Sequence, residues 1–339
     1  MRQEEAAMKQ SLLQRCETQI RNETTLRKGH KLDFEQIIKL GALMYANAGA
    51  EVDIDRLREC KLLLKDKVGL LSNFRGHMQY LVQIKMALSE DPNEYIDDVL
   101  DAYAQLKQGR KLPGEMVAMA ATTICDNCPK EKRAEVIQKT RDAYAKIKSQ
   151  HLFLTDEGDM ALIALMIMAG IDPDQATEDA EGLYDMLKGS FLPGSDTPQA
   201  VAMVLALSNR PAEQKVQDFL GLFGACKAAG HATGKNKAMT IYATYADVDA
   251  SRDEIVADIG EVDVWLKKKK GYGALGIGAS TRRLFAATLV LEDRQEANAT
   301  AMAGATNAVA QTVVEQMLLV LISIIVTSVI ISASVNSSH

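Results

Sequence analysis

Five-residue segments that end in lysine recur along this chain at nearly constant spacing. Their first residues are 41, 40, 39 and 40 positions apart. Leading into the first segment and through it, apolar side chains recur at i, i+3, i+7 and i+10 from Ile96 to Leu106, which places them on one face of a helix. We therefore predict that each segment ends an amphipathic helix whose aromatic stripe faces the core. The segments are residues 103–107, 144–148, 184–188, 223–227 and 263–267.

The stretches between these helices are more uniformly apolar and predict a second set of helices. Prolines stand between the two sets, where they suit the first turn of the next helix. No alternating β-branched run bounded by turns precedes residue 317. The pattern predicts an all-α fold, a solenoid of about six antiparallel helical hairpins with a period of about 40 residues. The apolar stretches include residues 116–124, 160–168, 200–207 and 284–291.

The chain beyond the repeat has a different composition. From Gln295 to the end there is no lysine or arginine, and residues 317–335 form a run of 19 without a charge. This run reaches the minimum length of a membrane-spanning helix, but no basic or aromatic anchor flanks it. A spanning helix and a helix that is buried or joins two chains both remain open. The residues expected to carry the interaction are Met317, Leu318, Leu321, Ile324 and Ile325.

These patterns divide the chain into three predicted regions. Residues 1–30 are predicted to form a charged N-terminal helix, and residues 31–293 the helical repeat array. Residues 294–339 are predicted to form an alanine-rich and apolar C-terminal helix. The repeat therefore accounts for most of the chain, and the tail is a separate element.

Composition narrows the classes of partner. The chain has 47% hydrophobic residues, 5% aromatic residues and a net charge of −6. An acidic balance with few aromatic rings argues against nucleic acid as a partner. Five scattered cysteines without a secretion signal at the N-terminus predict reduced thiols and a cytoplasmic location, with possible membrane association through the C-terminus. A small-molecule partner stays undetermined.

Two glycine-rich stretches come close to nucleotide-binding motifs. Residues 271–276 match G-x-G-x-x-G, but a helix that ends in four lysines precedes them where the dinucleotide motif needs a strand. Residues 230–236 are one residue short of a P-loop and also follow a helix. Both are predicted to be turns of the repeat. A phosphate at the first loop is kept as a lesser hypothesis, with Lys270, Gly271, Gly273 and Gly276 as an anion loop.

The remaining motifs predict neither a cofactor nor a metal site. Cys125 and Cys128 form a lone C-x-x-C without the second ligand pair that structural zinc needs. No H-E-x-x-H and no G-x-S-x-G occurs. We therefore predict no catalytic, cofactor-binding or metal-binding residues.

Three features in order resemble a known family. They are the helix ends of the repeat, the stretch 270–273 leading into residues 283–287, and the alanine-rich uncharged C-terminus that ends in serines. The chain resembles the bacterial domain of unknown function numbered four thousand and three, over most of its length. This resemblance implies a helical fold and supplies no activity, substrate or site residues.

Three functional hypotheses follow. The first is a non-catalytic interaction or scaffold protein that binds a protein partner, or itself, through the C-terminal helix. The second is a membrane-associated protein anchored by residues 317–335. The third, with the least support, is an enzyme or binder of a phosphorylated ligand at the loop 271–280.

Overall fold

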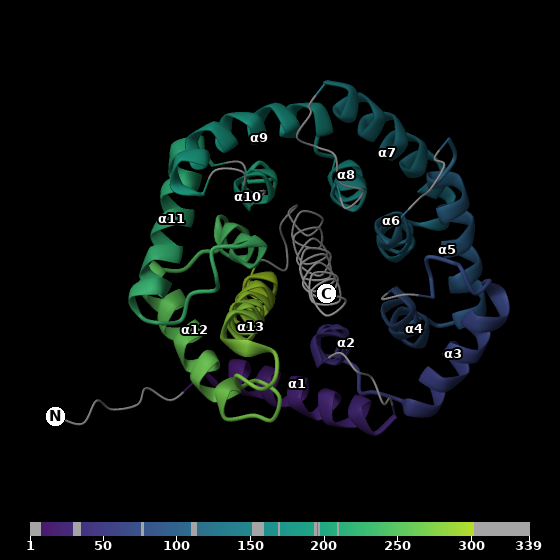
Figure 1. Ribbon diagram of the computed structural model, residues 1–339, viewed down its shortest axis with the longest axis horizontal. Coiled ribbons are helices and arrows are strands. Elements are labelled where there is room, and N and C mark those ends of the chain that lie inside the picture. The colour runs from purple at the N-terminus through teal and green to yellow at the C-terminus, as the bar shows by residue number, and fades with distance from the viewer. Residues whose placement is uncertain are drawn as a thin grey trace, which may run out of the picture. The chain divides into compact units, whose positions relative to one another are not determined.

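The fold is described here from a computed structural model. It describes residues 8–29, 35–75, 78–109, 114–150, 159–168, 170–192, 195, 197–208 and 210–301. Every regular element within these ranges is a helix, and none of them is a strand, so the predicted all-α class is confirmed (Figure 1).

The chain divides into two compact units, with the divisions inside α1 and α9. In its described part, unit 1 comprises residues 8–21 and 180–301, and unit 2 comprises residues 22–179. The elements of unit 1 are the first part of α1 (Gln10–Gly29), the end of α9 (Pro173–Leu187), η1 (Lys188–Ser190), α10 (Thr197–Leu205), α11 (Ala212–Ala228), η2 (Lys237–Tyr245), α12 (Arg252–Lys267) and α13 (Gly278–Ala301). Those of unit 2 are the end of α1, α2 (Glu35–Asn47), α3 (Ile54–Lys67), α4 (Met78–Leu88), α5 (Pro92–Leu106), α6 (Glu115–Asn127), α7 (Lys130–Gln150), α8 (Asp159–Met168) and the start of α9.

Local sequence signals explain where many helices begin. The Asp91 side chain accepts hydrogen bonds from the amides of Asn93 and Glu94 at the start of α5, and Pro92 takes the first helical position. At the start of α12, Ser251 and Glu254 form a reciprocal capping box. These caps satisfy amides that have no partner inside the helix.

The predicted helix ends are also found. Helices α5, α7, α9, α11 and α12 end at Leu106, Gln150, Leu187, Ala228 and Lys267, at or within two residues of the ends of the five lysine-terminated segments. After α5 and α11 the backbone turns through Gly109 and Gly230, at φ 81° and 82°, where a side chain would be strained.

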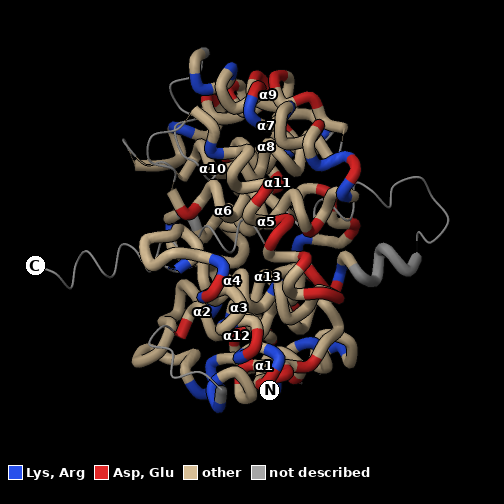
Figure 2. Tube along the Cα trace, turned by 90° about the vertical axis from the view of Figure 1, so that its right-hand side faces the viewer, with Lys and Arg blue, Asp and Glu red and all other residues tan. Residues whose placement is uncertain are grey.

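Unit 2 consists of two rows of helices. The outer row is α3, α5 and α7, and the inner row is α2, α4, α6 and α8 (Figure 1). Each helix of the inner row packs on its neighbour in that row, and α4, α6 and α8 also pack on the outer row. Charged residues fall mainly on the outer helices, whereas α6 and α8 carry few (Figure 2).

Unit 1 is less regular. Helix α12 packs on α11 and α13, and η2 packs on α10, α11 and α13. The 3-10 helix η2 lies between α11 and α12, where the repeat predicts a helix of the second set, and Tyr242 and Tyr245 on it are buried. In the first part of α1, Leu12 and Cys16 are buried as well.

The three predicted regions stay a prediction. Helix α1 ends at Gly29, next to the first predicted border. Helix α13 runs from Gly278 to Ala301, across the border predicted after residue 293. Residues 302–339, which include most of the predicted C-terminal region, lie outside the described residues.

Candidate functional site

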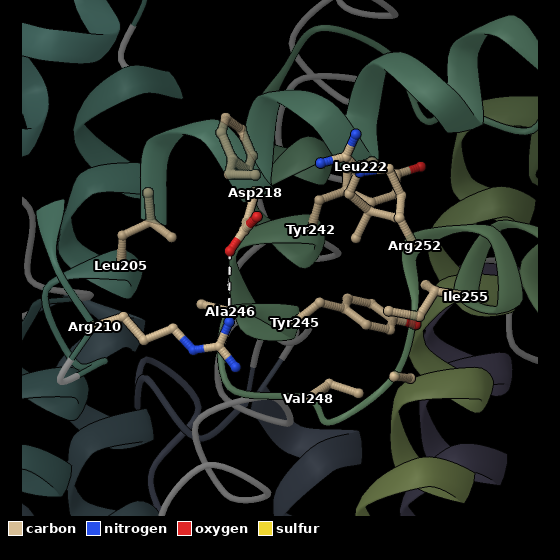
Figure 3. Close-up of a pocket in the computed structure, with 12 residues that line it drawn as sticks. Leu205, Arg210, Asp218, Leu222, Tyr242, Tyr245, Ala246, Val248, Arg252 and Ile255 are labelled. Atoms are coloured by element: carbon tan, nitrogen blue, oxygen red, sulfur yellow. Dashed lines mark hydrogen bonds and ion pairs between the residues drawn. The ribbon is translucent and has the colours of Figure 1, made fainter. Parts of the chain in front are cut away.

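A cavity of about 210 Å³ lies in unit 1 among α10, α11, η2 and α12. We call it the α11 cavity. Most residues of its lining are aliphatic or aromatic, and three charged side chains, Arg210, Asp218 and Arg252, complete the lining (Figure 3). The apolar walls come from Leu205, Phe219, Leu222, Tyr242, Tyr245, Ala246, Val248, Ala250 and Ile255.

The two arginines of the α11 cavity are in different situations. Arg210 lies 3.5 Å from the carboxylate of Asp218 and 3.6 Å from that of Asp247. Arg252 is exposed, lies across the cavity from Arg210, and pairs with no carboxylate among the described residues (Figure 3). Its guanidinium group is therefore available to an anion.

A glycine inside α11 makes room for this guanidinium group. A Cβ atom at Gly221 would lie 2.6 Å from Arg252 Cζ, closer than real contacts allow. Glycine in a helix interior costs about 1 kcal/mol relative to alanine. Arg252 can thus lie against α11 only because position 221 is a glycine, a residue that lowers the stability of a helix.

The two tyrosines of the α11 cavity serve as walls. The Tyr242 hydroxyl accepts a hydrogen bond from the amide of Thr233 at 3.0 Å, and the Tyr245 hydroxyl donates to the carbonyl of Ala287 at 2.5 Å. Burial raises the pKa of both hydroxyls above the ordinary range. Both therefore stay protonated at neutral pH and fix η2 in place.

A buried group of charges lies elsewhere in unit 1, around Asp263 on α12. One carboxylate oxygen lies 2.6 Å from Arg282 Nε, and the other lies 2.8 Å from His231 Nδ1 and 3.4 Å from Arg283 Nε. Burial by itself raises the pKa of this carboxyl, but hydrogen bonds from Arg282 and His231 and the charges of both arginines hold the pKa below its ordinary value. Asp263 is therefore ionised at neutral pH, and we call these four residues the Asp263 cluster.

The Asp263 cluster brings the two glycine-rich loops together. Arg282 donates to the carbonyl of Tyr272 in one loop, at 3.1 Å, and Arg283 donates to the carbonyl of Ala232 in the other, at 3.0 Å. The amide of Gly234 donates to Ser280 Oγ at 2.9 Å. Stretches that resemble nucleotide motifs thus converge on one ion pair.

The predicted anion loop is a compact turn. The amides of Gly276 and Ile277 donate to the carbonyls of Gly273 and Gly271, both at 3.0 Å, and Lys270 is exposed. A Cβ atom at Gly276 would lie 2.0 Å from the carbonyl oxygen of Gly271, so this turn needs glycine there. Two amides of the loop already serve the turn, and anion binding at these residues stays a prediction.

All five cysteines are free and buried. Burial raises the pKa of the Cys16 and Cys125 thiols to about 12 and that of Cys60 and Cys226 to about 11. In the C-x-x-C stretch, Arg133 donates to the carbonyls of both Cys125 and Cys128, at 3.2 and 3.0 Å. These thiols are protonated at neutral pH, and the stretch is held through its backbone.

Within the described ranges, no group of three or more His, Cys, Asp or Glu side chains is arranged to hold a metal ion. No helix in the same ranges is long and apolar enough to cross a membrane. The predicted interaction residues Met317, Leu318, Leu321, Ile324 and Ile325 lie outside the described residues.

Neither the α11 cavity nor the Asp263 cluster was predicted from the sequence, yet each leaves a signal there. Four of the five repeat segments begin with Tyr or Phe, whereas the fifth begins with Asp263. A carboxylate at a position that is otherwise aromatic and largely buried indicates a buried partner. Gly221, inside a predicted helix, permits a close approach by another group, although Gly224 on the same helix has open space beside it.

Comparisons with known proteins give a family but no closer relative. Neither the curated proteins nor the solved structures contain a match to this chain. A family model described as "Protein of unknown function (DUF4003)" matches residues 24–327, which is most of the chain. The resemblance noted in the sequence is therefore confirmed, and the chain belongs to this family of unknown function.

Proposed function

We propose that this protein is a non-catalytic scaffold, an α-solenoid of about six helical hairpins whose inner row holds an apolar segment of protein. We further propose that residues 317–335 of the same chain are that segment. A partner protein would bind by offering an apolar helix to the same row. The observation that carries the proposal is the burial of the inner helices on all sides.

Helix α6 illustrates this burial. Its residues 117–125 are nine consecutive buried positions, which span two and a half helical turns and so point in every direction. Among the helices of the described ranges, those that pack closely on α6 are α5 and α7 from the outer row and α4 and α8 beside it. None of these four covers the side of α6 that is turned away from the outer row, so a further apolar element is needed there.

Helix α8 supports the same conclusion. Seven consecutive residues, 160–166, are buried, and the charged Asp159 stands at its N-terminus. Helix α8 packs on α6 and α7. These two helices of the described part of the chain cover only part of a helix surface, whereas α8 is apolar all round.

The tail has the composition and length to fill this role. Residues 317–335 contain no charge, and 19 residues in a helix span about 28 Å. Fifteen residues separate this segment from the end of α13. A tether of that length keeps the segment at a high effective concentration, about millimolar for a flexible linker.

Ion pairs along the outer row support the repeat. Lys67 on α3 pairs with Asp97 on α5, Lys130 on α7 pairs with Glu94 on α5, and Lys146 on α7 pairs with Asp174 on α9. Helices α3, α5, α7 and the start of α9 are thus joined in order, each to the next, by a lysine and a carboxylate. A chain of nearest-neighbour contacts is what a solenoid requires.

The test compares the full-length protein with a Leu321→Arg, Ile325→Arg double variant and with a Ser337→Arg control. Binding of the dye ANS, light scattering and membrane fractionation are measured for each. We expect a monomeric wild type with low ANS fluorescence, and a several-fold rise for the double variant alone, because two charges would expel the segment.

Three results would overturn the proposal. Unchanged ANS fluorescence in the double variant would mean that residues 317–335 do not cover the row. Recovery of the wild type in the membrane fraction, and of the double variant in the soluble fraction, would establish a membrane anchor instead. A wild-type dimer that the double variant dissociates would place the segment in a second copy of the chain.

A further inference from the structure

We propose that the α11 cavity binds a small carboxylic acid with an apolar body, and that Arg252 binds its carboxylate. This inference goes beyond the scaffold function and does not depend on it, because the cavity is lined entirely by residues of unit 1. The apolar body would rest on the walls that Phe219, Tyr242 and Ile255 provide.

The volume of the α11 cavity sets the size of this ligand. A cavity of about 150 Å³ lined by apolar side chains is large enough to hold benzene. The α11 cavity, at about 210 Å³, therefore has room for a phenyl ring or a short branched alkyl chain. A volume of this size does not enclose a whole nucleotide.

The charge pattern selects a carboxylate. Among the arginines of unit 1, Arg210, Arg282, Arg283 and Arg294 each lie near an aspartate, whereas Arg252 pairs with no carboxylate in the described part of the chain. A guanidinium group presents two parallel N–H donors, which match a carboxylate. Asp218 lies in the same lining, and its charge opposes a dianion such as a phosphate monoester.

The glycine at position 221 is a second observation that supports Arg252 as the residue that binds the carboxylate. Gly224 lies one turn further along α11, and a Cβ atom there would meet nothing within 4 Å. Gly221 differs because the Arg252 guanidinium group occupies the place of its missing side chain. Alanine at position 221 would displace the flexible end of Arg252 and leave the backbone of α11 intact.

The test titrates the full-length protein with phenylacetate by calorimetry, at concentrations up to about 10 mM. Phenylacetamide, acetate and phenyl phosphate are the comparison ligands. We expect phenylacetate to bind, and each comparison ligand to bind roughly tenfold more weakly, because each lacks the charge, lacks the ring or carries a second charge.

Paired glycine variants separate a binding role from a structural one. Gly221→Ala should weaken phenylacetate binding several-fold while the melting temperature is unchanged or raised, because alanine favours the helix. Gly224→Ala should raise the melting temperature in the same way and leave binding unchanged. Arg252→Gln should weaken phenylacetate binding roughly tenfold, as removal of the ligand's charge does, and Arg58→Gln on α3 should have no effect.

Several outcomes would overturn the inference. These are no heat of binding for phenylacetate, equal affinity for phenylacetate and phenylacetamide, and wild-type affinity in Arg252→Gln. Equal weakening by Gly221→Ala and Gly224→Ala would also contradict it, because the effect would then belong to the helix and not to the guanidinium group. None of these results bears on residues 317–335, so failure here and failure of the scaffold proposal are distinguishable.

Discussion

Charged side chains are placed differently in two stretches of the molecule, α5–α8 of unit 2 and η2–α13 of unit 1. In the first, helices α6 and α8 are buried and apolar, and exposed pairs such as Lys130–Glu94 lie on the outer helices. In the second, Asp263 and Arg282 are both about 5% exposed and are bonded to each other inside the protein. Apolar burial therefore holds the first stretch, whereas the second also depends on an ion pair that must stay complete.

The largest expected effect comes from breaking that ion pair. Asp263→Ala leaves the Arg282 charge buried without its carboxylate, and removing one partner of such a pair costs about 3–5 kcal/mol of unfolding free energy. Urea denaturation of the full chain measures this loss. Asp185→Ala, which removes an exposed pair with Lys188, should leave the urea midpoint unchanged.

A double variant sharpens the same test. Asp263→Leu combined with Arg282→Met replaces both charges by apolar groups and should recover most of the lost stability. A double variant as unstable as Asp263→Ala would mean that hydrogen bonds to Tyr272 and His231, and not the uncompensated charge, carry the effect.

The corresponding test in the regular stretch is Leu165→Ala on α8. Leu165 is fully buried, and deleting its side chain should cost about 3 kcal/mol through lost burial and the cavity left behind. Urea denaturation again gives the value. Val264→Ala on α12 is the control, because Val264 is 46% exposed and its loss should change stability by less than about 0.5 kcal/mol.

Acid should act on the two stretches differently. The pKa of Asp263 is below its ordinary value in the folded protein, so its contribution is fully present above the ordinary value of about pH 4 and is lost as pH falls below that value toward the lower folded pKa. Wild-type stability measured from pH 6 to pH 3 should therefore fall more steeply than that of Asp263→Leu combined with Arg282→Met. Parallel pH profiles for the two proteins would show that Asp263 is not the titrating group.

The smallest expected effects come from alanine substitutions at two helix glycines, one with open space beside it and one with a close neighbour. A Cβ atom at Gly182 on α9 would meet nothing within 4 Å, so Gly182→Ala should stabilise the protein by up to about 1 kcal/mol. A Cβ atom at Gly260 on α12 would lie 3.0 Å from the His231 ring, so Gly260→Ala should destabilise it. Thermal melts compare the two variants. A higher melting temperature for both would mean that the side chains of the Asp263 cluster can shift at a smaller cost in stability than their contacts indicate.

Local signals explain how much of the fold was predictable. The ends of α5, α9 and α12 follow from the lysine-terminated segments, and the start of α5 follows from Asp91 and Pro92. These features act over a few residues, so one sequence contains them in full. The packing of α2, α4, α6 and α8 beside one another depends on contacts across the repeat and is not contained in any one segment.

The candidate sites were not predicted because their members are distant in sequence. Asp263 has partners 19, 20 and 32 residues away, and Arg252 at the start of α12 reaches the space beside Gly221 on α11. The glycine-rich loops were correctly doubted as dinucleotide and P-loop motifs, because helices precede both. Their shared position beside Asp263 follows only from the way α12 and α13 pack.

The reactivity of the five buried cysteine thiols can report local unfolding of this protein. Cys16 and Cys226 lie in unit 1, and Cys60, Cys125 and Cys128 lie in unit 2. Since each thiol is protonated and covered, an alkylating reagent modifies it only when the surrounding segment opens. Pulsed alkylation followed by peptide mass spectrometry would then give an opening free energy for each position. The order in which the two units unfold can thus be measured with the natural sequence, without an introduced label.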